Sequence, residues 1–172
     1  ERFGLSDPSV RKALLEVDWA GRWQRLEVDG RTLILDATHN EEGALALEEN
    51  MAKLVNDRGA KPWVVAGTLG EERGAALMAV VAKWARGITL LQPKQPRACS
   101  FEVLEKALPE GFLGEIRRSW VEELFPAKGK LSLGEPGDAV VVTGSIYLVG
   151  EVLTFLRGQR SPGGMSALQD WV

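Results

Sequence analysis

The strongest constraint on the fold is an alternation of short apolar runs with segments of helical periodicity. After two strand-like runs within 24–36, apolar runs recur at 62–67, 87–92 and 138–144, with a weaker one at 114–119. Helical patterns cover 41–57, 71–86, 100–108 and 145–158, and 120–130 contains a short helix. Because strand–helix–strand crossovers are right-handed and each helix covers the sheet, this order predicts a mostly parallel α/β sheet with helices on both faces.

The sheet is expected to begin with a hairpin. Asp29 and Gly30 separate two strand-like runs, and an Asp-Gly pair is a strong signal for a tight hairpin turn. The first run, QRLEV, alternates apolar and polar residues, whereas the second, RTLILD, is nearly continuous. This contrast indicates an N-terminal edge strand that leads into a buried strand.

Composition narrows the class of protein. The chain has 172 residues, of which 45% are apolar and 26% charged, as in one soluble globular domain. Its net charge of −3 gives no general attraction to nucleic acid or to an anionic membrane. No apolar run approaches the roughly 18 residues of a membrane span. The single cysteine, Cys99, excludes an internal disulfide and a four-cysteine zinc site, so we expect a reducing cytoplasm. We also expect a monomer.

The two ends differ from the middle of the chain. The N-terminal segment lacks the apolar core of a signal peptide and an initiator Met, so we expect a piece of a longer protein. Residues 1–17 are expected to be a linker, with a leading helix at about 8–17 that comes from a preceding domain. Residues 18–157 form the expected domain, and 158–172 a loosely held tail.

Parallel sheets of this kind bind ligands beyond the carboxyl ends of their strands. The expected rim consists of residues 36–40, 67–72, 92–97 and 143–145. On it, Asp36 ends a strand and could accept from a ribose hydroxyl, while His39, the only histidine, could donate to a phosphate oxygen. Asn40 stands at a helix start, where free N–H groups favour an anion. The alternative is that Asp36 or Asn40 caps the helix and His39 is incidental.

A second strand-to-helix junction has the same form. Gly144 would allow a ligand or loop to approach, and Ser145 with the helix N–H groups could hold a carboxylate or phosphate, unless Ser145 is an ordinary cap. Arg22 could bind phosphate, whereas Arg97 reads as a solvated loop residue and Cys99 as structural. The sequence contains no G-x-x-x-x-G-K-[ST] and no G-x-G-x-x-G, so it carries parts of an anion site without a complete catalytic set.

Four motifs together resemble one known family. GRW at 21–23, LILDATHN at 33–40, PRA at 96–98 and VTGSIYLVGEV at 142–152 occur in this order. They resemble the C-terminal domain of folylpolyglutamate synthase/dihydrofolate synthase in the Mur ligase superfamily, whose motifs read roughly G-R-[FW], L-D-G-A-H-N-P, P-R-A and T-G-S-L-Y-L-V-G-E. The last motif is the most specific. The resemblance covers about residues 18–157 and implies a Rossmann-like glutamate ligase domain.

The resemblance also implies a function. In this family an N-terminal P-loop domain holds ATP and Mg²⁺, and the C-terminal domain closes over it. The enzyme phosphorylates a folate or dihydropteroate carboxylate, and the amino group of L-glutamate attacks the acyl phosphate. Domain closure shields the acyl phosphate from water. We therefore expect this chain to be inactive without its P-loop domain.

The residue roles follow from the motif positions. By resemblance, Arg22 reaches an ATP phosphate, Asp36 the ribose region, and His39, the expected catalytic residue, the phosphates. Asn40 and Ser145 match positions on the glutamate side.

The chain departs from the family pattern at two places. Ala37 and Glu41 stand where the family has Gly and Pro, and Glu72 stands at a usual lysine, so Arg73 would have to contact glutamate instead. These departures leave two alternatives, another Mur-type amino-acid ligase or a degenerate binding and assembly module.

Overall fold

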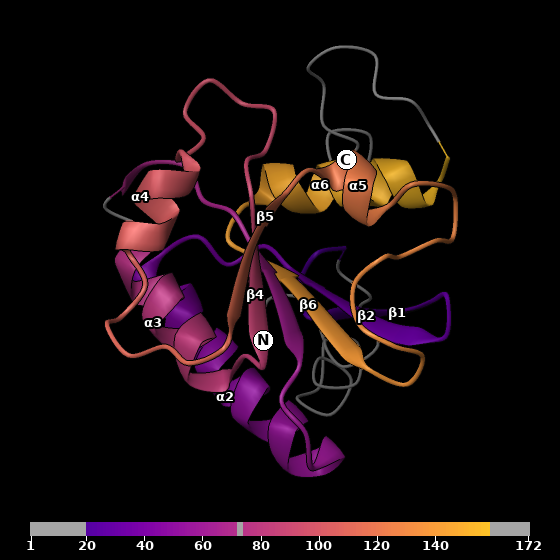
Figure 1. Cartoon of the computed structure of the whole chain (residues 1–172), viewed down its shortest axis with the longest axis horizontal. Helices are drawn as coiled ribbons and strands as arrows, with labels where there is room; N and C mark the ends of the chain where they lie inside the picture. The colour runs from indigo at the N-terminus through magenta and orange to yellow at the C-terminus, as the bar shows by residue number, and fades with distance from the viewer. Residues whose placement is uncertain (1–19, 72–73, 159–172) are drawn as a thin grey trace, which may run out of the picture.

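The computed structural model describes residues 20–71 and 74–158 and contains one six-stranded sheet (Figure 1). The strands are β1 Gln24–Val28, β2 Arg31–Asp36, β3 Trp63–Ala66, β4 Gly87–Leu91, β5 Glu115–Ser119 and β6 Ala139–Thr143. Their order across the sheet is β1-β2-β6-β3-β4-β5. β1 pairs antiparallel with β2, and every other neighbouring pair is parallel. The predicted mostly parallel sheet is confirmed.

Helices cover both faces of the sheet, as predicted. They are α2 Glu41–Arg58, α3 Gly74–Trp84, α4 Phe101–Lys106, α5 Val121–Leu124 and α6 Ile146–Leu156. Figure 1 shows α2, α3 and α4 on one side of the sheet and α5 and α6 on the other. The expected helix at 71–86 is shorter than predicted, because Arg86 N already donates to Pro62 O as the chain turns into β4. The expected leading helix at 8–17 and the tail after 158 lie outside the described residues.

The two-residue period of the strands divides the core into two clusters. In β2 the side chain of Ile34 packs with α2, α3 and α4, whereas Leu33 and Leu35 pack with α5 and α6. In β6 the same division separates Val141 from Val140 and Val142. All of these side chains are fully buried, which explains why the strands read as continuous apolar runs.

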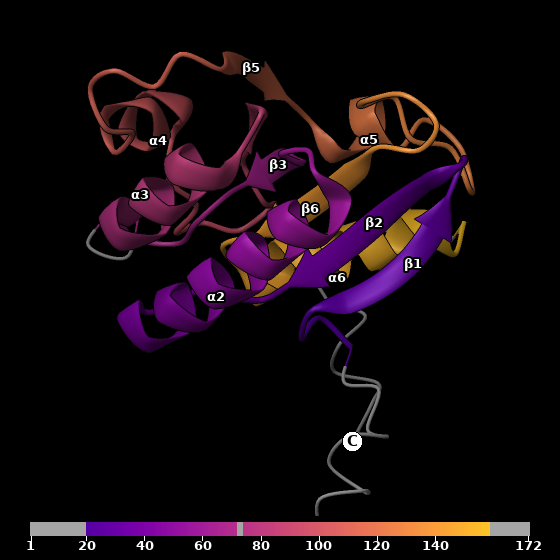
Figure 2. The ribbon, with the colours of Figure 1, turned by 90° about the horizontal axis from the view of Figure 1, so that it is seen from below.

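The N-terminal hairpin has the form that the sequence predicted. Asp29 and Gly30 both have positive φ, 53° and 77°, as a tight two-residue hairpin turn requires. Exposed and partly buried residues alternate along β1, whereas five of the six residues of β2 are buried. Figure 2 shows the two strands side by side at the edge of the sheet. Here β1 is the edge strand and β2 the covered one.

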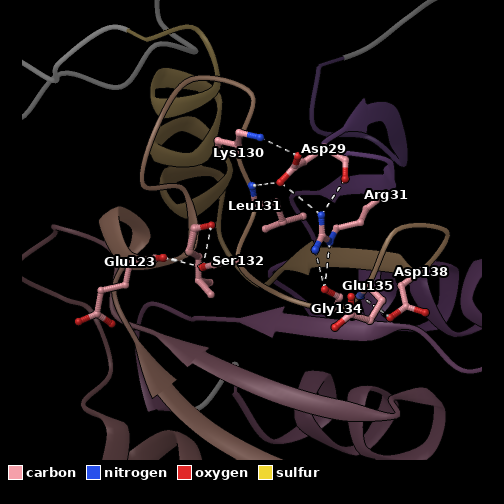
Figure 3. Close-up of polar contacts among 10 residues, drawn as sticks. Asp29, Arg31, Glu123, Lys130, Leu131, Ser132, Gly134, Glu135 and Asp138 are labelled. Atoms are coloured by element: carbon pink, nitrogen blue, oxygen red, sulfur yellow. Dashed lines mark hydrogen bonds and ion pairs between the residues drawn. The ribbon is translucent and has the colours of Figure 1, made fainter.

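A polar network ties the loop between α5 and β6 to the hairpin turn (Figure 3). Arg31 Nε and Nη2 both donate to Gly134 O, at 3.1 and 2.7 Å. Lys130 Nζ pairs with Asp29 Oδ1 at 3.2 Å, and Leu131 N donates to the other carboxylate oxygen. The network lies where β2 and β6 begin, so it secures the end of the sheet opposite to the predicted rim.

None of the helices within residues 20–71 and 74–158 is both long and apolar enough to cross a bilayer.

Candidate functional site

A pocket lies at the carboxyl ends of the four central strands, on the rim that the sequence predicted. Its volume is about 170 Å³, and the described residues that line it are His39, Leu69, Arg97, Gly144, Ser145, Ile146 and Tyr147. They come from the segments that follow β2, β3, β4 and β6, so each central strand delivers at least one residue. The prediction that these four segments meet at one edge is confirmed.

The topology explains why the rim is hollow at this point. β6 lies between β2 and β3, and the helix that follows β6 packs on the opposite face from the helices that follow β2 and β3. Adjacent connections therefore diverge and leave a crevice outside the strand ends. Gly144 in this crevice has φ +112°, and a Cβ there would lie 2.6 Å from Gly67 O. The β6–α6 turn thus requires glycine.

Asp36 holds the first rim segment together. Its carboxylate is buried and accepts hydrogen bonds from Trp23 N at 3.1 Å, from Thr38 N at 3.0 Å and from the Thr38 hydroxyl. Ala37 N also donates to Gly21 O at 2.7 Å, so the GRW and DATHN segments form one unit. Both carboxylate oxygens are occupied here, and the ribose contact of Asp36 stays a prediction.

His39 is exposed and borders the pocket. Its Nδ1 lies 2.8 Å from Ala37 O. Because a carbonyl oxygen only accepts, this contact assigns a proton to Nδ1. The other ring nitrogen, Nε2, remains available for a ligand. Nε2 accepts a proton in the neutral ring and donates to an anion in the protonated ring.

Asn40 is the N-cap of α2. Its Oδ1 accepts from Gly43 N at 2.8 Å, and its backbone is extended, with φ −143° and ψ 173°. Asn40 is not among the described residues that line the pocket. The alternative capping role is therefore present, and the expected contact of Asn40 with glutamate stays a prediction.

Ser145 is both a cap and part of the pocket wall. Its side chain is 2% exposed, and Oγ accepts from Tyr147 N at 3.1 Å at the start of α6. Accepting this bond leaves the hydroxyl proton available for a ligand oxygen. The two roles that the sequence left as alternatives are thus compatible at this residue.

One further expected site residue is apart from the described pocket lining, and another lies outside the described residues. Arg22 is exposed and is not among its described lining residues. Arg73 lies outside the described residues, as does Glu72, so their expected effects on glutamate stay predictions.

The sequence did not assign a binding role to two polar residues of the pocket, Arg97 and Tyr147. Arg97 was interpreted as a solvated loop residue, but its exposed side chain lines the pocket, and its carbonyl accepts from Gly70 N at 3.2 Å. The signal was the PRA motif at the end of a buried strand. Tyr147, the only tyrosine of the chain, stands two residues after Ser145.

The chemistry of the lining is that of an anion site. Among the described residues it offers a guanidinium, an imidazole and two hydroxyls, and it contains no carboxylate. Ligand pockets for whole small molecules measure about 300–1,000 Å³. A pocket of about 170 Å³ therefore suits a phosphate or an amino-acid-sized group, with the rest of the ligand outside. Nowhere in 20–71 and 74–158 do three or more His, Cys, Asp or Glu side chains gather so that they could hold a metal ion.

Comparison with protein families gives an independent result. The model of the family described as "Mur ligase, glutamate ligase domain" matches residues 21–146. Folylpolyglutamate synthase of Lacticaseibacillus casei is 27% identical over 158 residues, which are 91% of this chain and 34% of that protein. The resemblance that the sequence motifs indicated is confirmed.

Solved structures agree in fold. The bifunctional folylpolyglutamate synthase/dihydrofolate synthase of Yersinia pestis, in complex with AMPPNP and a Mn ion, is 25% identical with a TM-score of 0.69, over 90% of this chain and 35% of that one. Folylpolyglutamate synthase of Mycobacterium tuberculosis, in complex with ADP and AMPPCP, is 22% identical with a TM-score of 0.65, over 91% of this chain and 36% of that one. The chain spans about a third of the length of these relatives.

Proposed function

This chain belongs to the Mur ligase, glutamate ligase domain family, and we propose that it acts as the glutamate-side domain of an ATP-dependent amide ligase. The product is an amide between L-glutamate and the carboxyl group of a folate or dihydropteroate. Supporting this choice are the curated relative, a folylpolyglutamate synthase, and the Yersinia pestis structure of a bifunctional enzyme of the same type.

The observation that carries the proposal is the pocket at the ends of the four central strands. Its described lining combines Arg97, His39 and Ser145, which are all donors to an anionic oxygen, and holds no carboxylate that would repel one. In an acyl-phosphate ligase the γ-phosphoryl group and the carboxylates of glutamate are the small anions to be held. A pocket of about 170 Å³ accommodates one such group at a time.

The reaction has two steps. First, a carboxylate oxygen of the acceptor attacks the γ-phosphorus of ATP, the bond to the bridging oxygen of ADP breaks, and an acyl phosphate forms. Second, the amino nitrogen of glutamate attacks the acyl carbon, the bond to the phosphate oxygen breaks, and the nitrogen loses a proton. The products are ADP, phosphate and the amide.

The pocket residues act on the charge in these steps. Arg97 and the Ser145 hydroxyl donate to the anion, and their energetic effect is greatest once water has been excluded. The Nδ1–H of His39 is engaged by Ala37 O, so its Nε2 donates to a phosphate oxygen in the protonated ring. In the neutral ring, Nε2 has a free lone pair instead and can accept the proton that the attacking amine loses.

The remaining parts of the active site come from the preceding part of the protein. A P-loop domain in the same chain would hold ATP and Mg²⁺ and would close over the rim to shield the acyl phosphate. Arg22, Asp36, Asn40 and Arg73 are the further contacts of this domain with nucleotide and glutamate.

A ligation assay on the full-length protein tests the proposal. ADP release should require both a folate-type acceptor and L-glutamate, and labelled glutamate should appear in the acceptor. Arg97→Ala should reduce the incorporation of glutamate by about 10-fold or more, the loss expected for a charge-assisted contact. The matched control is Arg25→Ala, since Arg25 is an exposed arginine on the edge strand β1. The proposal would be rejected if ADP release did not depend on glutamate, or if Arg97→Ala and Arg25→Ala reduced the incorporation of glutamate equally.

A further inference from the structure

The loop that carries Arg97 to the pocket is fastened on two sides. It spans residues 92–99 between β4 and α4. On the pocket side, Gly70 N donates to Arg97 O at 3.2 Å and Cys99 N to Thr68 O at 3.0 Å. These bonds join the loop to the segment after β3.

On its other side the loop is fastened to α6 by one carboxylate. The backbone N–H of Lys94 donates to Glu151 Oε1 at 2.5 Å. Lys94 Nζ pairs with Glu122 of α5, so the two bonds of Lys94 reach two different helices. The same helix α6 carries Ser145 at its N-cap, one turn and a half before Glu151.

A glutamate is not the residue expected at position 151 if its side chain only filled space between the helix and the loop. It is partly buried, and its second oxygen, Oε2, is buried without a hydrogen-bond partner among the described residues. Burial raises the pKa of this carboxyl above its usual range, and only Lys94 opposes that shift while Glu122 adds to it. A carboxylate with one buried, unpartnered oxygen costs stability relative to a well-packed neutral side chain. Its directed bond to the loop is what a neutral apolar residue could not supply.

We propose that Glu151 is a positioning residue, which fixes loop 92–99 to α6 and so holds Arg97 in the lining of the anion pocket that Ser145 also lines. Helix α6 then positions two residues of the pocket. It carries Ser145 at its N-cap, and its Glu151 holds the loop of Arg97 through the backbone N–H of Lys94. The functional part of this inference rests on the proposed role of the pocket, whereas the mechanical part concerns the loop alone.

The test compares Glu151→Met with Glu151→Gln in the full-length protein. Methionine has a similar length and keeps the packing, but its thioether sulfur is only a weak acceptor for Lys94 N, whereas glutamine keeps an amide oxygen as acceptor. Hydrogen exchange in peptides that cover 92–99 should be at least 5-fold faster in Glu151→Met and close to wild type in Glu151→Gln. Exchange in β3 and β6 should be unchanged in both, which shows that the fold is intact. Unchanged exchange in 92–99 of Glu151→Met would overturn the proposal.

Kinetics of the same variants separate this inference from the function proposed above. Glu151→Met should raise the KM for glutamate several-fold and change kcat less, and Glu151→Gln should restore the wild-type KM. If Arg97→Ala raises this KM but Glu151→Met does not, the positioning role is overturned and the pocket role stands. If neither variant changes it, the pocket role of Arg97 fails, and the exchange of 92–99 alone decides whether Glu151 fastens the loop.

Discussion

The residues of segment 36–40 have different structural and functional roles. Asp36 is buried with both carboxylate oxygens occupied, and Asn40 caps α2. Among these three residues only His39 lines the pocket, with Nδ1 bonded to Ala37 O. The alternative reading of the stretch as a helix cap therefore describes Asn40, but it leaves His39 without a structural task.

This division predicts the phenotype of His39→Ala in the full-length enzyme. The variant should lower kcat/KM for ATP-dependent ligation by about 1–3 kcal/mol, the size of a lost charge-assisted contact. Its melting temperature should hardly change, because an exposed side chain on the rim contributes little to the core. Steady-state kinetics and thermal unfolding measure the two effects, with Lys53→Ala on the exposed face of α2 as a control. A large loss of stability with normal kinetics would show that the histidine is structural.

The turn between β6 and α6 combines a positive φ with close packing at Gly144. Gly144 has φ +112°, and a Cβ there would meet Gly67 O at 2.6 Å and Leu77 Cδ2 at 2.9 Å. Gly144→Ala should therefore destabilise the protein by about 2–6 kcal/mol, since backbone strain and a clash add. Gly129→Ala is the matched control, because Gly129 has φ +70° with no atom within 4 Å of the added carbon. It should cost roughly 1–2 kcal/mol. Urea unfolding measures both; equal losses would contradict the crowding at the turn.

Local sequence patterns predicted most helices, strands and turns. The order of the strands in the sheet and the contacts between distant loops depend on long-range contacts. The Asp29-Gly30 turn and the Ser100 cap depend on neighbouring residues, so the sequence could predict them. The insertion of β6 between β2 and β3 joins residues 107 positions apart in the β2–β6 pair and 77 apart in the β3–β6 pair, and no local pattern encodes it. The bond between Lys94 and Glu151 depends on that insertion, because β6 leads into α6. The sequence placed segment 92–97 on the rim, but the contact of the Arg97 side chain with the pocket depends on this long-range arrangement.

The pH dependence of the free energy of unfolding should include a contribution from Glu151. Burial raises its pKa in the folded state, so between the ordinary and the raised value the folded protein holds a proton that the unfolded chain lacks. The free energy of unfolding contributed by this group therefore falls as pH rises through that window. Glu151→Gln removes the ionisation and keeps the acceptor, so its stability relative to wild type should increase with pH and then level off. Urea unfolding between about pH 4 and pH 8 measures the difference; a difference independent of pH would contradict it.

The proposed ligase chemistry can be tested by following one oxygen atom. If the acceptor is activated as an acyl phosphate, an oxygen of its carboxylate leaves with the phosphate when glutamate attacks. The full-length protein would be given ATP, L-glutamate and a dihydropteroate or folate acceptor whose reacting carboxylate carries ¹⁸O. With both carboxylate oxygens labelled, mass spectrometry should find one ¹⁸O atom in each released phosphate. The amount of labelled phosphate should equal the amount of amide formed. Phosphate without ¹⁸O, released while amide accumulates, would contradict the account.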